Sequence, residues 1–385
     1  MRATGERIHL TRAALLAIAA IFFLMGVLAS AYGPLLELLA NRFEVTLSVA
    51  GGVLSAHFLG ALLGVVVSMR ILQRVPIRTF AFGALGCLGV GCAGVAVAPS
   101  WPSFLASVFV IGVGFGALDI GCNQLVAHSG GTRRTAILNA LNGTFGLGAV
   151  AGPLLASTVG RAHLSLLYGG AAVVALALWP LVGGMSGRLP FTAQRAADRS
   201  GALMAIFMVA FAFYVGLETG IGGWMPSHLE STGLQPLAAA TLTSGFWLAL
   251  AAGRLFVAAL PARLPERAIV ITGSAVAAVA LLTALVPTAA PVAYIVAGLA
   301  IAPIFPTGIV WLAKLRPKDA RATSWLFPAS MLGGAIIPGG IGAVIGRSGV
   351  GSAPAVLAVV AVGCLASFWL AATGSVRRAE DSQLP

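Results

Sequence analysis

The sequence predicts an all-α membrane protein in which twelve transmembrane helices form two pseudo-symmetric six-helix bundles. Of its 385 residues, 59% are hydrophobic and 9% are charged, whereas soluble domains carry about 25% charged residues. The mean hydropathy is +0.99. Because one helix needs about 20 apolar residues to cross a bilayer, the chain has room for about a dozen spans. No sizeable extramembrane domain fits beside them.

Apolar stretches separated by charged or turn-forming residues predict the individual spans. They lie at 13–38, 46–69, 79–98, 103–127, 135–159, 163–185, 201–226, 237–260, 268–287, 291–313, 323–345 and 352–373. The first span contains Ala29-Ser30-Ala31, which resembles a signal-peptidase site. Its apolar run is long and eleven more spans follow, so we expect an uncleaved first helix.

The basic residues predict the orientation of the chain. Twenty of the 23 Lys and Arg fall in the two termini and in the loops that follow even-numbered spans, with Arg254 counted in the loop after span 8. Arg42, Arg161 and Arg347 remain for the other side. Since cytoplasmic loops carry the excess of Lys and Arg, both termini are predicted to be cytoplasmic in a bacterial-type inner membrane. The net charge of +12 therefore reflects topology and indicates no nucleic-acid partner.

The two halves of the chain repeat each other. Five residues of span 2 and its following loop recur 189 positions later: Ser55, Gly64, Arg74, Pro76 and Arg78 return as Ser244, Gly253, Arg263, Pro265 and Arg267. Gly148 and Pro153 return as Gly333 and Pro338, and Gly26 and Gly33 as Gly216 and Gly223. The repeat predicts six-helix bundles at 1–185 and 201–385, joined by a basic cytoplasmic linker at 186–200, with a short cytoplasmic tail on the second bundle.

Two parallel six-helix repeats with both termini inside resemble the major facilitator superfamily, in which the halves rock about a midplane site. The stretch from Gly64 to Arg78 is similar to the superfamily's signature loop. It departs at Gln73, where the family usually has an acid, and at Pro76, where it usually has glycine. We expect a gating role for the basic residues of this loop and of its repeat, which are Arg74, Arg78, Arg263 and Arg267.

Two of the eleven acidic residues lie deep within predicted spans: Asp119 in span 4 and Glu218 in span 7. Placing a carboxylate at bilayer depth costs several kcal/mol, so both residues are candidate functional residues. We expect Asp119 roughly 6 Å from its span centre toward the cytoplasm, and Glu218 roughly 8 Å from its own toward the outside. Both are predicted to couple transport to an ion. The structural alternative is a carboxylate paired with an Arg or amide that locks two helices together.

Glycine, proline and polar residues concentrate in spans 1, 4, 7 and 10, and such interrupted helices point to a transport site. The candidate substrate-binding residues are Tyr32, Asn123, Asn139, Asn142, Tyr214, Trp224, Trp247 and Trp311. Aromatic rings can stack on the C–H face of a sugar. The alternatives are interhelical hydrogen bonds for the asparagines and interfacial or core positions for the tryptophans.

Short runs resemble the sodium-dependent glucose transporters and fucose permeases within the superfamily. They are 115–123 (FGALDIGCN), 141–148 (LNGTFGLG), 214–218 (YVGLE) and 302–307 (APIFPT). The resemblance implies monosaccharide symport coupled to H⁺ or Na⁺, with Asp119 as the coupling acid. Fucose permeases carry a second acid where this sequence has Ser30, which favours sodium coupling or a proton role for Glu218.

Other function classes fit less well. A drug/H⁺ antiporter of the same fold is the alternative function. The sequence has no HExxH, GxGD or GxSxG motif of an enzyme and no GxxxxGK[ST] loop of an ATP-driven pump. The four cysteines lie in apolar runs without CxxC spacing, so neither a metal nor another cofactor is predicted. We expect a monomer with a small-molecule substrate and lipid as its partners.

Overall fold

The computed structural model describes residues 9–128, 134–188, 201–259, 264–317 and 323–381. Within these residues, twelve helices are long and apolar enough to cross a membrane, which confirms the predicted fold class. The chain divides into two compact units: Met1–Val45 with Gly52–Ala193, and Thr46–Gly51 with Gln194–Pro385.

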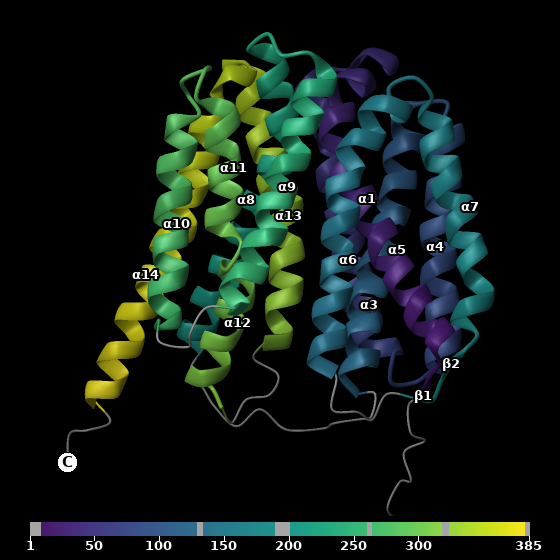
Figure 1. Ribbon diagram of the computed structural model, residues 1–385, viewed down its shortest axis with the longest axis horizontal. Coiled ribbons are helices and arrows are strands. Elements are labelled where there is room, and N and C mark those ends of the chain that lie inside the picture. Colours follow the sequence, from purple (N-terminus) through teal and green to yellow (C-terminus); the bar gives the residue numbers. More distant parts are fainter. Residues whose placement is uncertain (1–8, 129–133, 189–200, 260–263, 318–322, 382–385) are drawn as a thin grey trace, which may run out of the picture. The chain divides into compact units, whose positions relative to one another are not determined.

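The first unit is a bundle of long helices (Figure 1). They are α1 (Arg12–Arg42), α3 (Gly52–Ile71), α4 (Ile77–Val97), α5 (Trp101–His128), α6 (Arg134–Leu155) and α7 (Leu164–Val182), and α6 ends in a π-helical segment, η1 (Ala156–Gly160). Helix α3 packs along α5, α1 packs along α6, and α4 lies between α5 and α7. Helix α5, which carries Asp119, is therefore held by neighbours on two sides.

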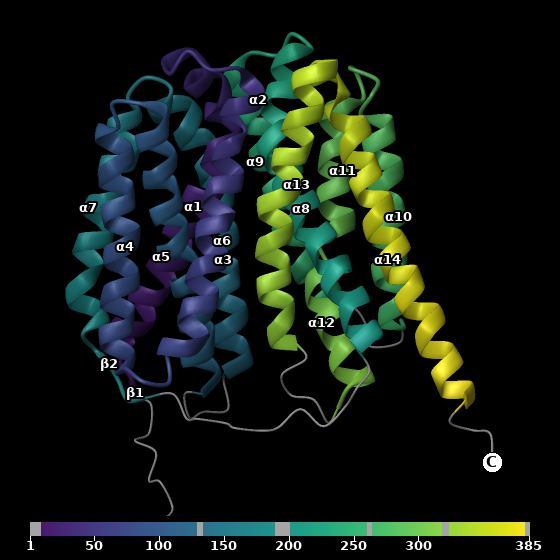
Figure 2. The same cartoon turned by 180° about the vertical axis from the view of Figure 1, so that it is seen from behind.

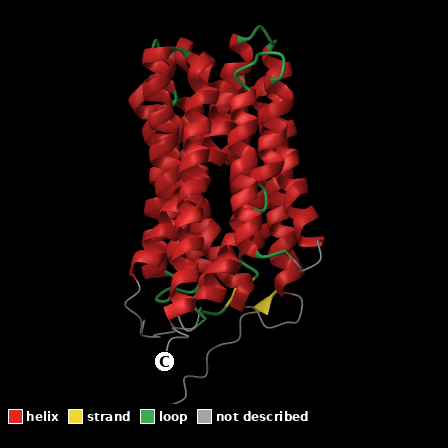
Figure 3. Ribbon diagram, turned by 90° about the vertical axis from the view of Figure 1, so that its left-hand side faces the viewer, coloured by secondary structure: helices red, strands yellow, loops and turns green. Residues whose placement is uncertain are grey.

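A small sheet brings the two ends of this unit together. Strand β1 (His9–Leu10) pairs antiparallel with β2 (Met185–Ser186) at one end of the helices (Figure 3). The backbone N–H of Ile77 donates to the carbonyl of Gly187 at 3.1 Å. The segments before α1 and after α7 thus meet at the start of α4.

The second unit contains the remaining helices. They are α2 (Leu47–Ala50), α8 (Gly201–Ser231), α9 (Pro236–Ala259), α10 (Glu266–Thr283), α11 (Ala290–Ile301), α12 (Ile304–Leu315), η2 (Thr323–Trp325), α13 (Leu326–Ser348), η3 (Val350–Ser352) and α14 (Ala353–Asp381). Helix α8 packs against α13 and α14, while α10 packs against α11 and α14 (Figure 2). Helix α9 contacts α8 and α11, so a side chain of α9 can reach the acid on α8.

Two proline positions shape this unit differently. The tenth predicted span is divided into α11 and α12 at Ala302–Pro303, because proline has no N–H to continue the helical ladder. Helix α8, in contrast, continues through Pro226 to Ser231, five residues beyond its predicted end. Glu218 consequently lies two residues past Gly216, the middle of this 31-residue helix. Relative to the middle of the observed helix, Glu218 therefore lies closer to the centre than the predicted span implies.

Glycines allow α1 and α6 to approach at backbone distance. A Cβ atom placed on Gly26 would lie 2.1 Å from the carbonyl oxygen of Phe145, and one on Gly148 would lie 2.0 Å from that of Phe23. Real side chains do not occupy such distances. The small residues at these positions therefore serve close helix packing, as small-xxx-small pairs do in membrane proteins.

Candidate ion-coupling and substrate site

Glu218 of α8 forms an ion pair with Arg254 of α9. The Nη2 atom of Arg254 donates to both carboxylate oxygens of Glu218, at 3.3 and 3.2 Å, and to the hydroxyl of Tyr214 at 3.1 Å. The side chain of Glu218 is 12% exposed and that of Arg254 is 28% exposed. Two opposite charges therefore neutralise each other within helices that are otherwise apolar.

This pair corrects one part of the charge count. Arg254 was expected in the loop after span 8, but it lies inside α9 (Pro236–Ala259). Because a guanidinium paired with a carboxylate is compensated locally, it need not lie at the cytoplasmic ends of the helices. The pair also matches the structural alternative for Glu218, a carboxylate held by an arginine of a neighbouring helix.

Three buried polar atoms follow one another along the same face of α9. Ser244 and Trp247 are each 5% exposed. The Oγ atom of Ser244, the Nε1 atom of Trp247 and the Nε atom of Arg254 have no hydrogen-bond partner among the described residues. The indole of Trp247 lies against α8 at Gly222, where a Cβ atom would approach the ring to 2.6 Å. Helix α9 thus carries three buried polar atoms that have no hydrogen-bond partner among the described residues.

Asp119 of α5 has a different environment. It is half-buried, and its Oδ1 atom accepts a hydrogen bond of 3.0 Å from Nδ2 of Asn123, one turn later on the same helix. That amide nitrogen also donates to the backbone carbonyl of Asp119 at 2.9 Å. Asp119 forms no ion pair with any described residue. Its carboxylate therefore lies within the span without a compensating cation.

The aromatic candidates lie mainly in the interiors of the two units. Tyr32 is 1% exposed, and its hydroxyl lies 3.1 Å from Nδ1 of the buried His57. Trp224 is fully buried and donates its indole N–H to the carbonyl of Pro338 at 3.1 Å. The ring of Trp311 lies between those of Phe207 and Phe368. Of the predicted tryptophans, Trp247 combines burial with an unused donor.

The amide and arginine candidates are more exposed. Asn142 is exposed and donates to the carbonyl of Leu138 in its own helix at 2.9 Å. Arg78 and Arg267 are exposed near the starts of α4 and α10, and Arg74 is exposed in the turn between α3 and α4. The side chain of Asn139 and the whole of Arg263 lie outside the described residues.

Sequence reasoning missed Arg254 and His57 as members of buried polar groups. A signal for Arg254 was present, since it is a charge within the predicted span 237–260, and a second deep charge of opposite sign was available in Glu218. No comparable signal marked His57, which packs against Phe58 and Phe115 besides Tyr32.

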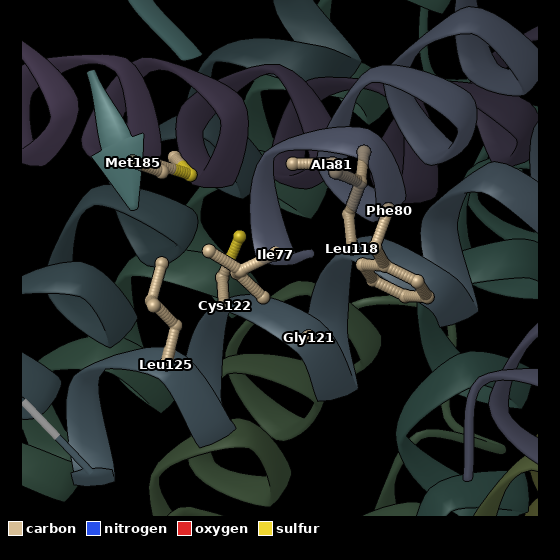
Figure 4. A pocket seen from close by; sticks show the side chains of 8 residues that line it. All are labelled: Ile77, Phe80, Ala81, Leu118, Gly121, Cys122, Leu125 and Met185. Atoms are coloured by element: carbon tan, nitrogen blue, oxygen red, sulfur yellow. The ribbon is translucent and has the colours of Figure 1, made fainter. Parts of the chain in front are cut away.

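A small cavity of the first unit is lined by residues of α4, α5 and β2, and Asp119 is not among them (Figure 4). Its lining consists of Ile77, Phe80, Ala81, Leu118, Gly121, Cys122, Leu125 and Met185. All of these are apolar or weakly polar, so the cavity offers no partner for a polar solute. Among the described residues there is also no group of three His, Cys, Asp or Glu that could hold a metal ion.

Comparison with known proteins agrees with this architecture. The sequence profile of the Major Facilitator Superfamily matches residues 18–201, and a crystal structure of a D-xylose-proton symporter superposes with a TM-score of 0.79 at 13% identity, covering 92% of this chain and 96% of that one. The chain has the major facilitator fold. The transporter FucP in its outward conformation is also similar, with a TM-score of 0.64 at 17% identity over 93% of this chain and 98% of that one.

Curated relatives are distant. The protein TsgA of Shigella dysenteriae is 24% identical over 259 residues, which is 65% of each chain. The 3-(3-hydroxy-phenyl)propionate transporter of Escherichia coli is 26% identical over 239 residues, 58% of each chain. The matches thus span less than two thirds of these relatives. The family and the similar structures are those of transporters rather than enzymes, as the sequence predicts.

Proposed function

We propose that this protein is a secondary active transporter that moves a small polar solute together with H⁺ or Na⁺ by alternating access. The observation that carries the proposal is the carboxylate of Asp119, half-buried within a membrane-spanning helix and without a cationic partner among the described residues. An acid in that position is unfavourable unless it takes up a proton or a cation during the transport cycle.

The two deep acids are assigned different roles. Glu218 is compensated by Arg254, so its charge is balanced before any ion binds. We therefore assign ion coupling first to Asp119 and solute recognition to the group around Glu218. The similarity to the D-xylose-proton symporter and to the 3-(3-hydroxy-phenyl)propionate transporter supports solute transport in general. The monosaccharide and the gating arginines remain predictions.

The test uses the purified chain in proteoliposomes. Labelled hexoses and organic acids are offered under a proton gradient, a sodium gradient or no gradient. Accumulation under one gradient alone identifies the coupling ion. In Asp119→Asn, exchange of solute without a gradient is expected to continue while accumulation is lost, because the amide keeps the shape of the side chain but not its charge. Glu44→Gln, the same acid-to-amide change at an exposed residue between α1 and α2, is the matched control.

Full gradient-driven accumulation in Asp119→Asn would refute the coupling role of Asp119. Failure of every offered solute to accumulate or exchange would refute transport of small polar solutes as such.

A further inference from the structure

We propose that the contact between α8 and α9 is a subsite for the carboxylate of an organic acid, which would make organic acids the substrate class. That these acids are transported rests on the proposed function, whereas the binding of a carboxylate rests on the geometry of the site. The site consists of Arg254 on α9, which is bonded to Glu218 and Tyr214 on α8, and of Trp247 and Ser244 on earlier turns of α9.

The three unpartnered polar atoms of α9 are spaced along one face of the helix. Positions 244, 247 and 254 are three and seven residues apart, so they share one face of the helix. The indole N–H of Trp247 and the Nε–H of Arg254 can only donate, and the hydroxyl of Ser244 can donate as well. Buried polar atoms are normally hydrogen-bonded, and exceptions call for an explanation. Because the three donors are spread over about 15 Å of the helix axis, one ligand reaches them with a carboxylate at Arg254 and further acceptor groups at Trp247 and Ser244.

The guanidinium of Arg254 has an N–H group that no described residue accepts. Its Nη2 atom serves Glu218 and Tyr214, while the neighbouring Nε atom is buried without a partner. Arginine binds carboxylates most strongly through two parallel N–H groups. Glu218 therefore leaves part of the binding edge open, and a second carboxylate can take the Nε–H or displace Glu218 from the fork.

The ring of Trp247 lies near the ion pair, against a glycine of α8. Gly222 lies one turn after Glu218 on α8, about 6 Å along the axis, and Trp247 covers it at a distance that a Cβ atom would obstruct. The ring of Trp247 and the guanidinium of Arg254 thus follow one another along the contact between α8 and α9, which we call the strip. A neutral sugar is a weak competitor here because its hydroxyls carry no charge with which to displace Glu218. An acid with a ring or further acceptors beyond its carboxylate suits the strip.

The experiment measures binding to the purified full-length chain in lipid nanodiscs by isothermal titration, without any ion gradient. Two matched pairs are compared: 3-phenylpropionate with 3-phenylpropanamide, and glucuronate with glucose. At least one acid is expected to bind about tenfold more tightly than its neutral partner, as a charge-assisted pair allows. Arg254→Gln is expected to abolish the preference, and Glu218→Gln, which removes the competing carboxylate, to increase it.

Because Arg254→Gln leaves Glu218 unpaired, the double variant Arg254→Gln/Glu218→Gln serves where the single variant does not fold. Equal or absent binding of both members of both pairs overturns the proposal, and so does an acid preference that survives the loss of Arg254. A purely structural ion pair predicts that neither substitution changes the ratio of acid to neutral affinity.

A matched pair of tryptophan variants tests the strip. Trp247→Phe removes the unused N–H and keeps a ring against Gly222, so acid affinity is expected to fall by about three- to tenfold, the value of one buried hydrogen bond. Trp179→Phe removes an N–H that already serves the carbonyl of Phe82 in the first unit and should leave the affinity unchanged. Equal effects of the two variants would contradict the assignment.

The two proposals fail separately. Acid binding without gradient-driven accumulation would refute symport and leave the carboxylate site intact. Accumulation of neutral solutes without acid binding would support transport and refute the site.

Discussion

The two units contain one deep acid each and treat it in opposite ways. In the first unit, Asp119 accepts a hydrogen bond from Asn123 of its own helix and has no cationic partner among the described residues. In the second unit, Glu218 is bound to Arg254 of a neighbouring helix. The first acid can change its charge without breaking a contact between helices. The second cannot, and we therefore expect it to contribute to stability and recognition.

A second pair of groups shows the same contrast more weakly. Each unit buries a tyrosine against a histidine: Tyr32 lies 3.1 Å from Nδ1 of His57, and Tyr294 lies 3.2 Å from that of His228. The Nε2 atom of His57 has no partner among the described residues, whereas that of His228 is not among the buried unpaired atoms. Of these two tyrosine–histidine pairs, the one in the first unit thus leaves a buried histidine nitrogen unsatisfied.

The largest expected effect comes from breaking the ion pair of the second unit. Arg254→Gln should destabilise the protein by about 3 kcal/mol, at the low end for a buried pair because both side chains are partly exposed. The readout is thermal unfolding in detergent, compared with Asp119→Asn. The double variant Arg254→Gln/Glu218→Gln should recover part of the loss. If the double variant is as unstable as the single one, the cost arises from packing and not from the unpaired acid.

The repeat offers the next comparison, between Gly26 and its equivalent Gly216. A Cβ atom on Gly26 meets the backbone carbonyl of Phe145 at 2.1 Å, but one on Gly216 meets the side chain of Ile337 at 2.3 Å. A side chain can move where a helix backbone cannot. Gly26→Ala should therefore cost about 3 kcal/mol and Gly216→Ala about 1 kcal/mol. Equal shifts in the unfolding temperature would show that α1 and α6 can separate without penalty.

The tyrosines provide a smaller difference. Tyr32→Phe leaves His57 without its hydrogen-bonded partner in a fully buried position, and we expect a loss of about 1.5 kcal/mol. Tyr294→Phe should cost about 1 kcal/mol, because His228 has less unsatisfied polarity. Both variants keep the ring, so thermal unfolding reports the hydroxyl alone. A larger loss in Tyr294→Phe would reverse the order of the two units.

Much of the fold could be predicted because span length and apolarity are local properties. The break between α11 and α12 at Pro303 was not predicted, because the apolar run 291–313 continues through the proline. The end of α8 was missed because proline at position 226 is accommodated inside a buried helix. The pairing of Arg254 with Glu218 was missed for a different reason: it depends on how α8 and α9 meet, and residue counting assigns every arginine to a loop.

The site was predictable in part for the same reason. Asp119 and Asn123 share a helix, so their contact follows from a spacing of four residues. The donors on α9 are recognisable only after their neighbours are known, because Ser244 and Trp247 read as ordinary core residues in the sequence. What distinguishes them is the lack of an acceptor among the described residues.

The smallest expected effect on stability belongs to Asp119→Asn. Asparagine has almost the same shape as aspartate, and its side-chain oxygen can still accept from Asn123 as Asp119 does at 3.0 Å. Loss of the charge removes a desolvation cost and breaks no ion pair with a described residue. The free energy of unfolding should therefore change by less than about 0.5 kcal/mol, in the range of substitutions outside special structural features. An unchanged unfolding temperature together with lost accumulation would show that the first unit keeps this carboxylate for its ability to change charge. A loss as large as that of Arg254→Gln would show instead that both acids hold helices together, and the contrast between the units would disappear.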